Sequence, residues 1–397
     1  MRLFTSSWVV PVARPPIRDG RVAVDGGRIA WVGGPGGPGE PKGTLEDLGP
    51  GVILPGLVNA HCHLELSYLQ GRIPLPLAFV PWVRELIAAR AHETPNVLRA
   101  GVERGVQQLL DAGTAAVGDI SNDLAHLDLL ADSGLRAVVF HELIGWDPAR
   151  AEAIMDEADA RLAALPNGLA AKCVSVRTAA HAPHSVSAAL LGRLLARGGP
   201  AAVHLAESAG EARFLRAGDD EWSSLLRDRG LGHVVFDPPG VTPVQYLDSL
   251  GILRPGLLAA HCVQTDAADR TLLARRGVFV AICPRSNRNL ELGPAPVAEL
   301  LAAGVRLCLG SDSLASAGTL SVLDDARALR LTFPALPAEA LVRMATLGGA
   351  EALGLSELGS IEPRKVAALA HASTQAAVPD PLEYLLSGEA QLRRLSA

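Results

Sequence analysis

The sequence predicts an α/β fold, a closed barrel of eight parallel strands each followed by a helix, with a small β-sandwich built from both chain termini. Two observations predict the barrel: eight short, almost continuously apolar segments follow residue 51, and each precedes a longer stretch of helical periodicity. A third predicts a small sheet assembled from both termini, because turn-rich β-type sequence stands at both chain ends. We therefore expect a barrel at 51–355, flanked by β-rich segments at 1–50 and 356–397.

The N-terminal segment alternates short β-rich runs with turns. Two such runs surround Asp25-Gly26-Gly27, a sequence typical of a β-hairpin. The Gly/Pro tract at 33–39 is too flexible for the interior of an element. Residues 358–373 return to turn and strand character, so we expect them to join the N-terminal strands in one small domain.

The barrel elements alternate regularly along the chain. Strands are predicted at 52–60, 114–120, 135–141, 172–180, 200–205, 256–261, 278–283 and 305–310. Helices are predicted at 81–91, 96–111, 122–132, 148–164, 186–197, 266–276, 295–303, 320–331 and 337–353. A doubly wound open sheet is the alternative, but no Gly-x-Gly-x-x-Gly follows the first strand to favour it.

Composition argues against several classes of function. A net charge of −6 and a pI of about 6.0 argue against a partner that presents nucleic-acid phosphates. No apolar run is long enough to span a bilayer, and the first residues lack the apolar stretch of a signal peptide. The five cysteines contain no Cys-x-x-Cys pair, so we expect free thiols and a cytoplasmic location. A homodimer is compatible with the sequence, which carries no clear oligomerisation signal.

His61 and His63 form the strongest local signal, in the run PGLVNAHCHLE over residues 55–65. Residues two apart on a strand point to the same side, so both imidazoles can face one point. Two imidazoles on one face form half of a transition-metal site. Alone, such a pair is more often incidental than functional.

Other predicted strands also end in groups that bind metals or transfer protons. His204 ends the fifth strand with Glu207 three residues later, His261 ends the sixth, and Asp312 follows the eighth. The carboxyl ends of parallel barrel strands meet at one rim, where active sites are built. The coincidence of these residues at separate strand ends predicts one metal-dependent site.

With these motifs the chain resembles the amidohydrolase superfamily over residues 51–355, and its terminal segments 1–50 and 356–397 resemble the two parts of that superfamily's composite β-sandwich on a TIM barrel. The resemblance implies acid–base roles for Glu207, His261 and Asp312. The metal ligands it implies are His61, His63, His204 and Asp312.

The resemblance also implies one metal ion. Binuclear members carry a metal-bridging carbamylated lysine at the far end of the fourth strand, whereas Lys172 stands at its beginning, roughly 30 Å of extended chain too early. Zn²⁺ is the expected ion, and the same donor types also accept Fe²⁺ or Mn²⁺. A mononuclear site with Glu207 after His204 looks like the deaminase branch. There a bound divalent metal lowers the pKa of its water, and the glutamate protonates the ring nitrogen.

Three segments at the rim bear on the substrate. Residues 180–187, AHAPHSVS, resemble the superfamily's substrate-contacting turn, and residues 283–290, CPRSNRNL, resemble the Cys-Pro-x-Ser-Asn-x-x-Leu stretch of nucleoside deaminases. Two further carboxylates, in HLE at 63–65 and FHEL at 140–143, suit ribose hydroxyls or a ring N–H. The substrate contacts expected from these segments are Glu65, Glu142, His181, Arg285, Asn287 and Arg288.

Together these motifs most resemble aminodeoxyfutalosine deaminases of the alternative menaquinone pathway, whose substrate is an adenosine with a 5′ extension ending in a benzoate. Arg285 or Arg288 is expected to hold that carboxylate by paired hydrogen bonds. Deaminases of S-adenosylhomocysteine, methylthioadenosine or adenosine share much of the pattern. A hydrolase of cyclic amides or imidazolones and a catalytically inactive barrel scaffold are also compatible with the fold. Residues 218–243 form either a lid over the barrel mouth or an ordinary insertion.

Overall fold

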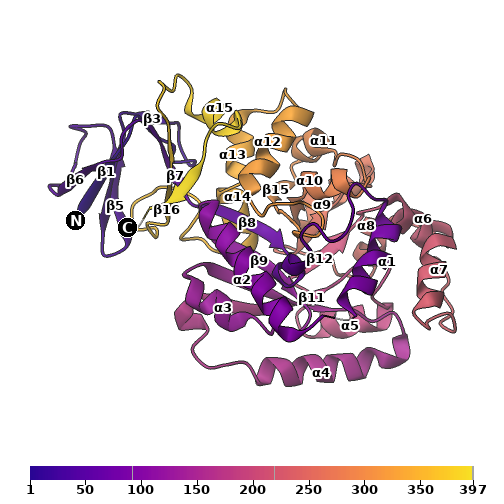
Figure 1. Ribbon diagram of the computed structural model, residues 1–397. Helices are drawn as coiled ribbons and strands as arrows, with labels where there is room; N and C mark the ends of the chain where they lie inside the picture. Colours follow the sequence, from indigo (N-terminus) through magenta and orange to yellow (C-terminus); the bar gives the residue numbers. More distant parts are fainter. Residues whose placement is uncertain (92, 219, 396–397) are drawn as a thin grey trace.

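Eight parallel strands form the centre of the computed structural model, which describes residues 1–91, 93–218 and 220–395 (Figure 1). They lie in two four-stranded sheets, ordered β11-β10-β9-β8 and β12-β13-β14-β15. The predicted α/β barrel is therefore confirmed. The strands are β8 (Leu57–Cys62), β9 (Thr114–Ser121), β10 (Arg136–Leu143), β11 (Val174–Ala180), β12 (Ala202–Leu205), β13 (Leu258–His261), β14 (Phe279–Ile282) and β15 (Arg306–Leu309).

Backbone hydrogen bonds close the barrel at the two seams between these sheets. At one seam the His204 N–H donates to the His181 carbonyl oxygen at 2.7 Å. At the other, the Asp312 N–H donates to the His61 carbonyl oxygen at 3.1 Å, and the His63 N–H donates to the Asp312 carbonyl oxygen at 3.1 Å. Both seams therefore run through residues of the predicted site.

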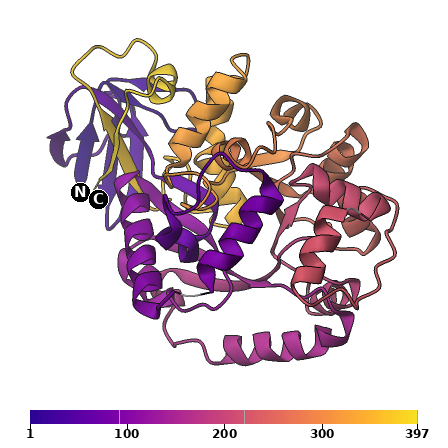
Figure 2. The ribbon, with the colours of Figure 1, turned by 45° about the vertical axis from the view of Figure 1, so that its right-hand side comes forward.

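Helices surround the barrel and cover its mouth (Figures 1 and 2). In the described residues no helix is long and apolar enough to cross a membrane. The helices are α1 (Phe79–Arg90), α2 (Pro95–Asp111), α3 (Leu127–Ser133), α4 (Ala151–Ala163), α5 (Ala188–Ala196), α6 (Ala209–Ala217), α7 (Asp220–Asp228), α8 (Pro243–Ser249), α9 (Ala267–Arg276), α10 (Pro284–Asn289), α11 (Val297–Ala302), α12 (Val322–Thr332), α13 (Ala338–Met344), α14 (Leu347–Leu353) and α15 (Pro381–Leu386), with 3₁₀ turns at Leu64–Leu69, Pro148–Arg150 and Ala170–Lys172.

Some element bounds differ from the predicted ones. The single strand predicted at 52–60 is two strands, because the chain passes from the terminal sheet into the barrel at Gly56, whose N–H donates to the Ala368 carbonyl oxygen at 2.8 Å. The helix predicted at 337–353 is divided into α13 and α14. The short helix α10 was not expected, and α7 lies inside the segment 218–243, which the sequence left irregular.

The sandwich contains strands from both ends of the chain, which lie side by side in both views (Figures 1 and 2). Residues such as Phe4, Val22 and Ile53 are fully buried between its two sheets. The predicted hairpin at Asp25 is present. One sheet has the order β5-β4-β1-β6 and the other β17-β16-β7-β2-β3, built from β1 (Arg2–Thr5), β2 (Trp8–Val9), β3 (Ile17–Arg18), β4 (Arg21–Asp25), β5 (Arg28–Gly33), β6 (Thr44–Asp47), β7 (Gly51–Pro55), β16 (Leu369–Ser373) and β17 (Leu392–Arg394).

A buried ion pair fixes the chain directly after β8. Asp119 on β9 accepts a hydrogen bond from the Leu64 N–H at 2.8 Å, and its other oxygen lies 2.7 Å from His126 Nε2. Burial by itself lowers the pKa of His126, but the Asp119 charge and hydrogen bond outweigh it and raise that pKa above its ordinary value. The folded protein therefore binds this proton more tightly than the unfolded chain does.

We predict that His126→Gln is destabilising mainly at acidic pH. Because the folded-state pKa is raised, the contribution of the ion pair is complete below the unfolded pKa of about 6.5 and is lost as pH rises through the folded-state pKa. Denaturant unfolding of both proteins at pH 5.5 should show a difference of about 2 kcal/mol. The difference should shrink towards pH 9, and one that stays constant across this range would contradict the assignment.

Candidate active site

A cavity of about 880 Å³ opens at the carboxyl ends of the barrel strands. Most of the polar residues predicted from the sequence lie around its base. Those that line it directly are His63, Glu142, His181, His204, Glu207, His261 and Asp312.

Three imidazoles converge at the base of this cavity. His61 is on β8, His63 follows that strand, and His204 is on β12 across the barrel. One nitrogen from each ring lies within 4.8 Å of the others, and the two Nε2 atoms of His63 and His204 are 3.2 Å apart. Asp312 Oδ1 lies 3.5 Å from His63 Nε2 and 3.9 Å from His61 Nε2. The fold therefore brings together all four predicted ligands.

The donor set fits a single divalent metal ion. His61 Nε2 is buried and has no hydrogen-bond partner among the described residues, an arrangement that costs free energy unless another group binds that nitrogen. Burial and the neighbouring imidazoles hold the pKa of His61 well below its usual range, so its ring is neutral and carries a free lone pair. Imidazole nitrogens with one carboxylate oxygen are ligands that Zn²⁺ prefers. Lys172 is exposed and pairs with Asp132 at 2.6 Å, remote from this cluster.

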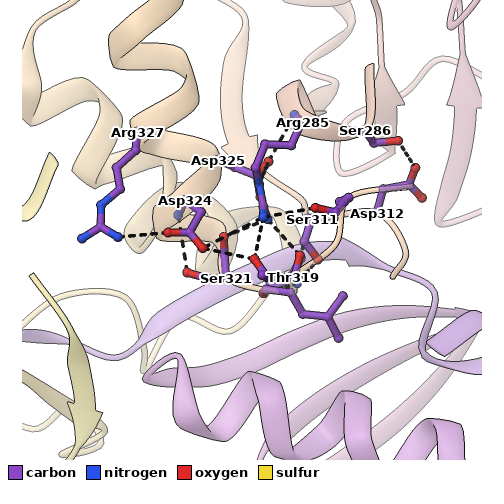
Figure 3. A network of polar contacts seen from close by, with 12 residues as sticks. Arg285, Ser286, Ser311, Asp312, Thr319, Ser321, Asp324, Asp325 and Arg327 are labelled. Atoms are coloured by element: carbon purple, nitrogen blue, oxygen red, sulfur yellow. Dashed lines mark hydrogen bonds and ion pairs between the residues drawn. The ribbon is translucent and has the colours of Figure 1, made fainter. Parts of the chain in front are cut away.

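Two serine hydroxyls orient the carboxylate of Asp312. Ser286 Oγ on α10 donates to Asp312 Oδ2 at 2.5 Å (Figure 3), and Ser316 Oγ donates to the same oxygen at 3.0 Å. The other oxygen of Asp312, Oδ1, therefore faces the histidines. The Asp312 backbone has φ +59° and that of His261 has φ +72°, conformations that non-glycine residues rarely adopt. Such strain is concentrated at functional sites.

A carboxylate behind His204 sets the orientation of its ring. Glu142 Oε1 lies 3.3 Å from His204 Nδ1, which is also 3.1 Å from the His181 carbonyl oxygen. Although burial raises the pKa of Glu142, the His181 and His204 rings outweigh it and lower that pKa, so Glu142 is ionised. Because Nδ1 of His204 faces these acceptors, its Nε2 is directed at the cluster. Metal-binding histidines commonly have such a partner on their other ring nitrogen. Asn122 Nδ2 donates to Glu142 Oε2 at 3.0 Å and holds this carboxylate in place.

Glu207 and His261 form a complementary acid and base beside the cluster. Glu207 Oε1 lies 3.5 Å from His261 Nε2. Burial raises the pKa of Glu207 to about 8 and lowers the pKa of His261 to about 4. Near neutral pH the carboxyl group therefore carries a proton and the imidazole can accept one. Environments that push two pKa values apart in this way are typical of acid–base partners.

The predicted substrate contacts fall into two groups. Glu142 and His181 line the cavity, whereas Glu65 and Asn287 do not. Asn287 Oδ1 lies 3.0 Å from His261 Nδ1 and orients that ring from behind. Glu65 accepts the Asn122 N–H at 2.9 Å and pairs with Arg90 at 3.0 Å, so it supports the wall that carries Asn122.

Arg285 and Arg288 lie outside the cavity lining, contrary to the expected carboxylate contact. The Arg285 guanidinium binds both oxygens of Asp325 on α12, at 3.0 and 2.7 Å, and also Thr319 (Figure 3). The physical reason is the direction of α10, which points Arg285 towards the buried Asp325 and leaves Arg288 exposed. These two arginines are therefore not retained as substrate contacts.

Other arginines, which no sequence motif singled out, line the cavity. They are exposed, and so they lie where the cavity meets solvent: Arg90 ends α1, Arg150 precedes α4, Arg161 is within α4, and Arg229 follows α7. Arg161 Nη1 donates to the Asn122 carbonyl oxygen at 2.7 Å. Their side chains come from helices and connections outside the strand-end motifs, so the spacing of those motifs gave no signal for them.

Helices α1 and α7 cover part of the cavity mouth. Trp222 on α7 packs over His184 with ring centroids 3.9 Å apart, and its ring also lies 6.0 Å from that of Phe79 on α1. Arg84 on α1 forms an ion pair with Asp228 on α7. The described part of residues 218–243 thus forms a wall of the cavity.

Comparison with known proteins agrees with this geometry. The model of the Amidohydrolase family matches residues 52–385. The chain is 32% identical over 387 residues to 5-methylthioadenosine/S-adenosylhomocysteine deaminase from Moorella thermoacetica, covering 92% of this chain and 84% of that protein. It is also 32% identical over 325 residues to aminodeoxyfutalosine deaminase from Deinococcus radiodurans, covering 78% and 75%.

Solved structures share the whole fold. Aminofutalosine deaminase from Helicobacter pylori, in complex with methylthio-coformycin, aligns over 100% of both chains with a TM-score of 0.86 at 22% identity. An adenosine deaminase from Xanthomonas campestris with bound zinc aligns over 98% of this chain and 89% of its own, with a TM-score of 0.76 at 27% identity. On the strength of its match to the family model and to these deaminases, the chain belongs to the amidohydrolase family and is a deaminase within it.

Proposed function

We propose that this metal-dependent deaminase of adenosine-type nucleosides converts 6-amino-6-deoxyfutalosine to futalosine and ammonia, a step of menaquinone biosynthesis. The observation that carries the substrate assignment is the cavity above the histidine cluster. Its base holds the acid–base pair, its walls are apolar, and arginines stand at its opening. The similarity to the Deinococcus radiodurans aminodeoxyfutalosine deaminase supports the same substrate.

The side chains at the base are arranged for hydrolytic deamination. His61, His63, His204 and Asp312 would hold a divalent metal ion, which we propose to be zinc, and when bound it would supply the Lewis acidity that makes water reactive near neutral pH. Glu207, protonated near neutral pH, is placed to donate its proton to the ring nitrogen beside the attacked carbon. His261 Nε2 and Asp312 Oδ1, which both face the histidine cluster, are placed to accept the proton that the attacking water gives up. That proton then leaves with ammonia, and the proton of the added hydroxyl returns to Glu207 as the ring carbonyl forms.

The walls of the cavity suit a benzoate-bearing extension. Trp82, Ile144 and Trp146 line it, and they offer an aromatic ring apolar contact. Arg150 and Arg161 stand nearer the solvent, and a guanidinium retains donors for a ligand after making one bond to the protein. We infer that these two arginines hold the terminal carboxylate.

S-adenosylhomocysteine is the second candidate substrate, and two observations favour it. The chain is also 32% identical to the 5-methylthioadenosine/S-adenosylhomocysteine deaminase of Moorella thermoacetica, over a larger share of its length than to the aminodeoxyfutalosine deaminase. Asp147 and Glu157 also line the cavity, and either carboxylate would pair with the ammonium group of its amino-acid tail. Aminodeoxyfutalosine has no such cation. Ammonia release from adenosine, methylthioadenosine, S-adenosylhomocysteine and aminodeoxyfutalosine, measured in parallel on the metal-loaded enzyme, separates these candidates. A highest kcat/KM for S-adenosylhomocysteine would reject our assignment, and turnover of cyclic amides alone would reject nucleoside deamination.

The proposed acid can be removed without removing the ligands. We predict that Glu207→Gln retains metal at the wild-type stoichiometry and loses about 10²–10⁴-fold in kcat, because the amide has no proton of suitable acidity to transfer. Metal content by elemental analysis and steady-state ammonia release check both parts. Wild-type turnover by this variant would remove Glu207 from the mechanism.

The ligand assignment makes a separate prediction. His204→Ala should reduce metal affinity by at least about 10-fold and abolish turnover, since one of three imidazole donors is missing. Competition with a chromogenic chelator measures the affinity directly, with Glu207→Gln as the catalytically impaired control. A His204→Ala protein that holds metal as tightly as that control would contradict the ligand set.

The proposed carboxylate contacts are tested by substrate discrimination. Arg150→Ala and Arg161→Ala should each raise KM for aminodeoxyfutalosine about 10-fold, because each removes a charge-assisted hydrogen bond. KM for methylthioadenosine, which has no carboxylate, should stay close to the wild-type value. Arg288→Ala, whose side chain lies outside the cavity, is the comparison variant. Equal losses on both substrates, or a selective loss in Arg288→Ala alone, would argue against this assignment.

A further inference from the structure

A buried carboxylate, Glu211, binds the backbone at the point where Glu207 leaves the barrel. Ser208 caps α6, and its Oγ accepts the Glu211 N–H at 3.0 Å, so Glu211 is the third residue of the helix. In an ordinary capping box the acidic residue at this position reaches back to the N–H of the capping residue itself. Glu211 reaches further. Its Oε2 accepts the Glu207 N–H at 2.8 Å and its Oε1 accepts the Ala206 N–H at 3.1 Å.

These two bonds hold a strained turn. Ala206 has φ +50°, in the left-handed region that alanine rarely adopts. On its other side the Ala206 carbonyl oxygen accepts the Gln264 N–H at 2.7 Å, and the Leu205 carbonyl oxygen accepts the Cys262 N–H at 3.0 Å. The turn that carries Glu207 is thus tied both to α6 and to the end of β13. His261, the partner of Glu207, stands at that end of β13.

Helix capping alone does not account for the buried position of Glu211. Its side chain is fully buried, it does not line the cavity, and no cation pairs with it among the described residues. Burying a carboxyl group costs free energy even when it accepts hydrogen bonds, and burial raises the pKa of Glu211 to about 8, as it does for Glu207. Ser208 already caps the helix. The two hydrogen bonds of Glu211 instead fix the direction of the peptide bond between Ala206 and Glu207.

We propose that Glu211 is a positioning residue for proton transfer by Glu207, an inference that rests on the proposed function. By accepting both N–H groups, its carboxylate fixes the backbone turn and keeps the Glu207 carboxyl group within reach of His261 and the substrate ring. Proton transfer needs donor and acceptor within hydrogen-bond reach, and a displacement of 1 Å can lower a rate about 10²-fold.

Glu211→Gln is the first test, because the amide has the same shape but can accept only one of the two N–H groups. We expect kcat to fall about 10–100-fold, with KM and metal content unchanged, since neither substrate binding nor the ligands depend on this carboxylate. Glu211→Asp is the second variant. Its shorter side chain cannot reach both N–H groups, so it should also lose kcat even if Glu211→Gln folds poorly.

Asp269 provides a matched control on a neighbouring helix. It is fully buried and is the third residue of α9, but it makes the ordinary capping box, accepting the N–H of its own capping residue Asp266 at 3.3 Å. It also accepts a hydrogen bond from Thr242, and it does not line the cavity. Asp269→Asn should lower the melting temperature while leaving kcat at the wild-type value. If it lowers kcat as much as Glu211→Gln does, the effect of Glu211 is general destabilisation and the proposal fails.

A double variant separates this inference from the proposed function. If Glu211 acts through Glu207, adding Glu211→Gln to Glu207→Gln should cause no further loss of kcat, because the proton transfer that it positions is already absent. Losses that multiply would overturn the positioning role. Wild-type activity in Glu207→Gln alone would instead overturn the role of Glu207, whatever Glu211→Gln does.

Discussion

Closure of the barrel is the constraint on which the site depends. The two seams are joined by main-chain hydrogen bonds of His204 to His181 and of His61, Asp312 and His63 to one another. The residues that complete the cylinder are thus the ones that carry its reactive side chains. Strands distant in sequence must end at one rim for these bonds to form, so the fold and the ligand set are specified by the same contacts.

Closure of the barrel also has a free-energy cost that the protein's own contacts do not remove. It buries imidazoles and carboxylates together, leaves His61 Nε2 without a partner among the described residues, and holds His261 and Asp312 in left-handed backbone conformations. A bound cation would satisfy the unpartnered nitrogen and offset the repulsion between like groups. The surrounding hydrogen bonds from Ser286 and Ser316 restrict the Asp312 carboxylate to one orientation.

The strand-end residues could be predicted from sequence because the two-residue period of a strand and the shared rim of a barrel fix where they point. The residues that line the outer part of the cavity could not be predicted in this way. Arg285 belongs to a motif that resembles a substrate-binding stretch, yet α10 directs it to Asp325, and the arginines at the opening come from α1, α4 and the segments beside them. Side-chain direction on a short helix or connection depends on tertiary packing, which spacing along one chain does not encode. The division of the first strand into β7 and β8 was also missed, although Pro55-Gly56 stands at the crossing and such a pair is a local signal for a break between strands.

Chemistry and specificity are therefore supported by different parts of the molecule. Each reactive group at the strand ends has a partner behind it: Glu142 behind His204, Asn287 behind His261, and Glu211 behind Glu207. None of these contacts involves the arginines at the opening. Under the proposed assignment, exchanging the outer helices would change which 5′ extension is held without disturbing proton transfer at the base. The chain is 32% identical to each of two relatives that are deaminases named for different nucleosides, so identity alone does not select the extension and the residues at the opening must be tested directly.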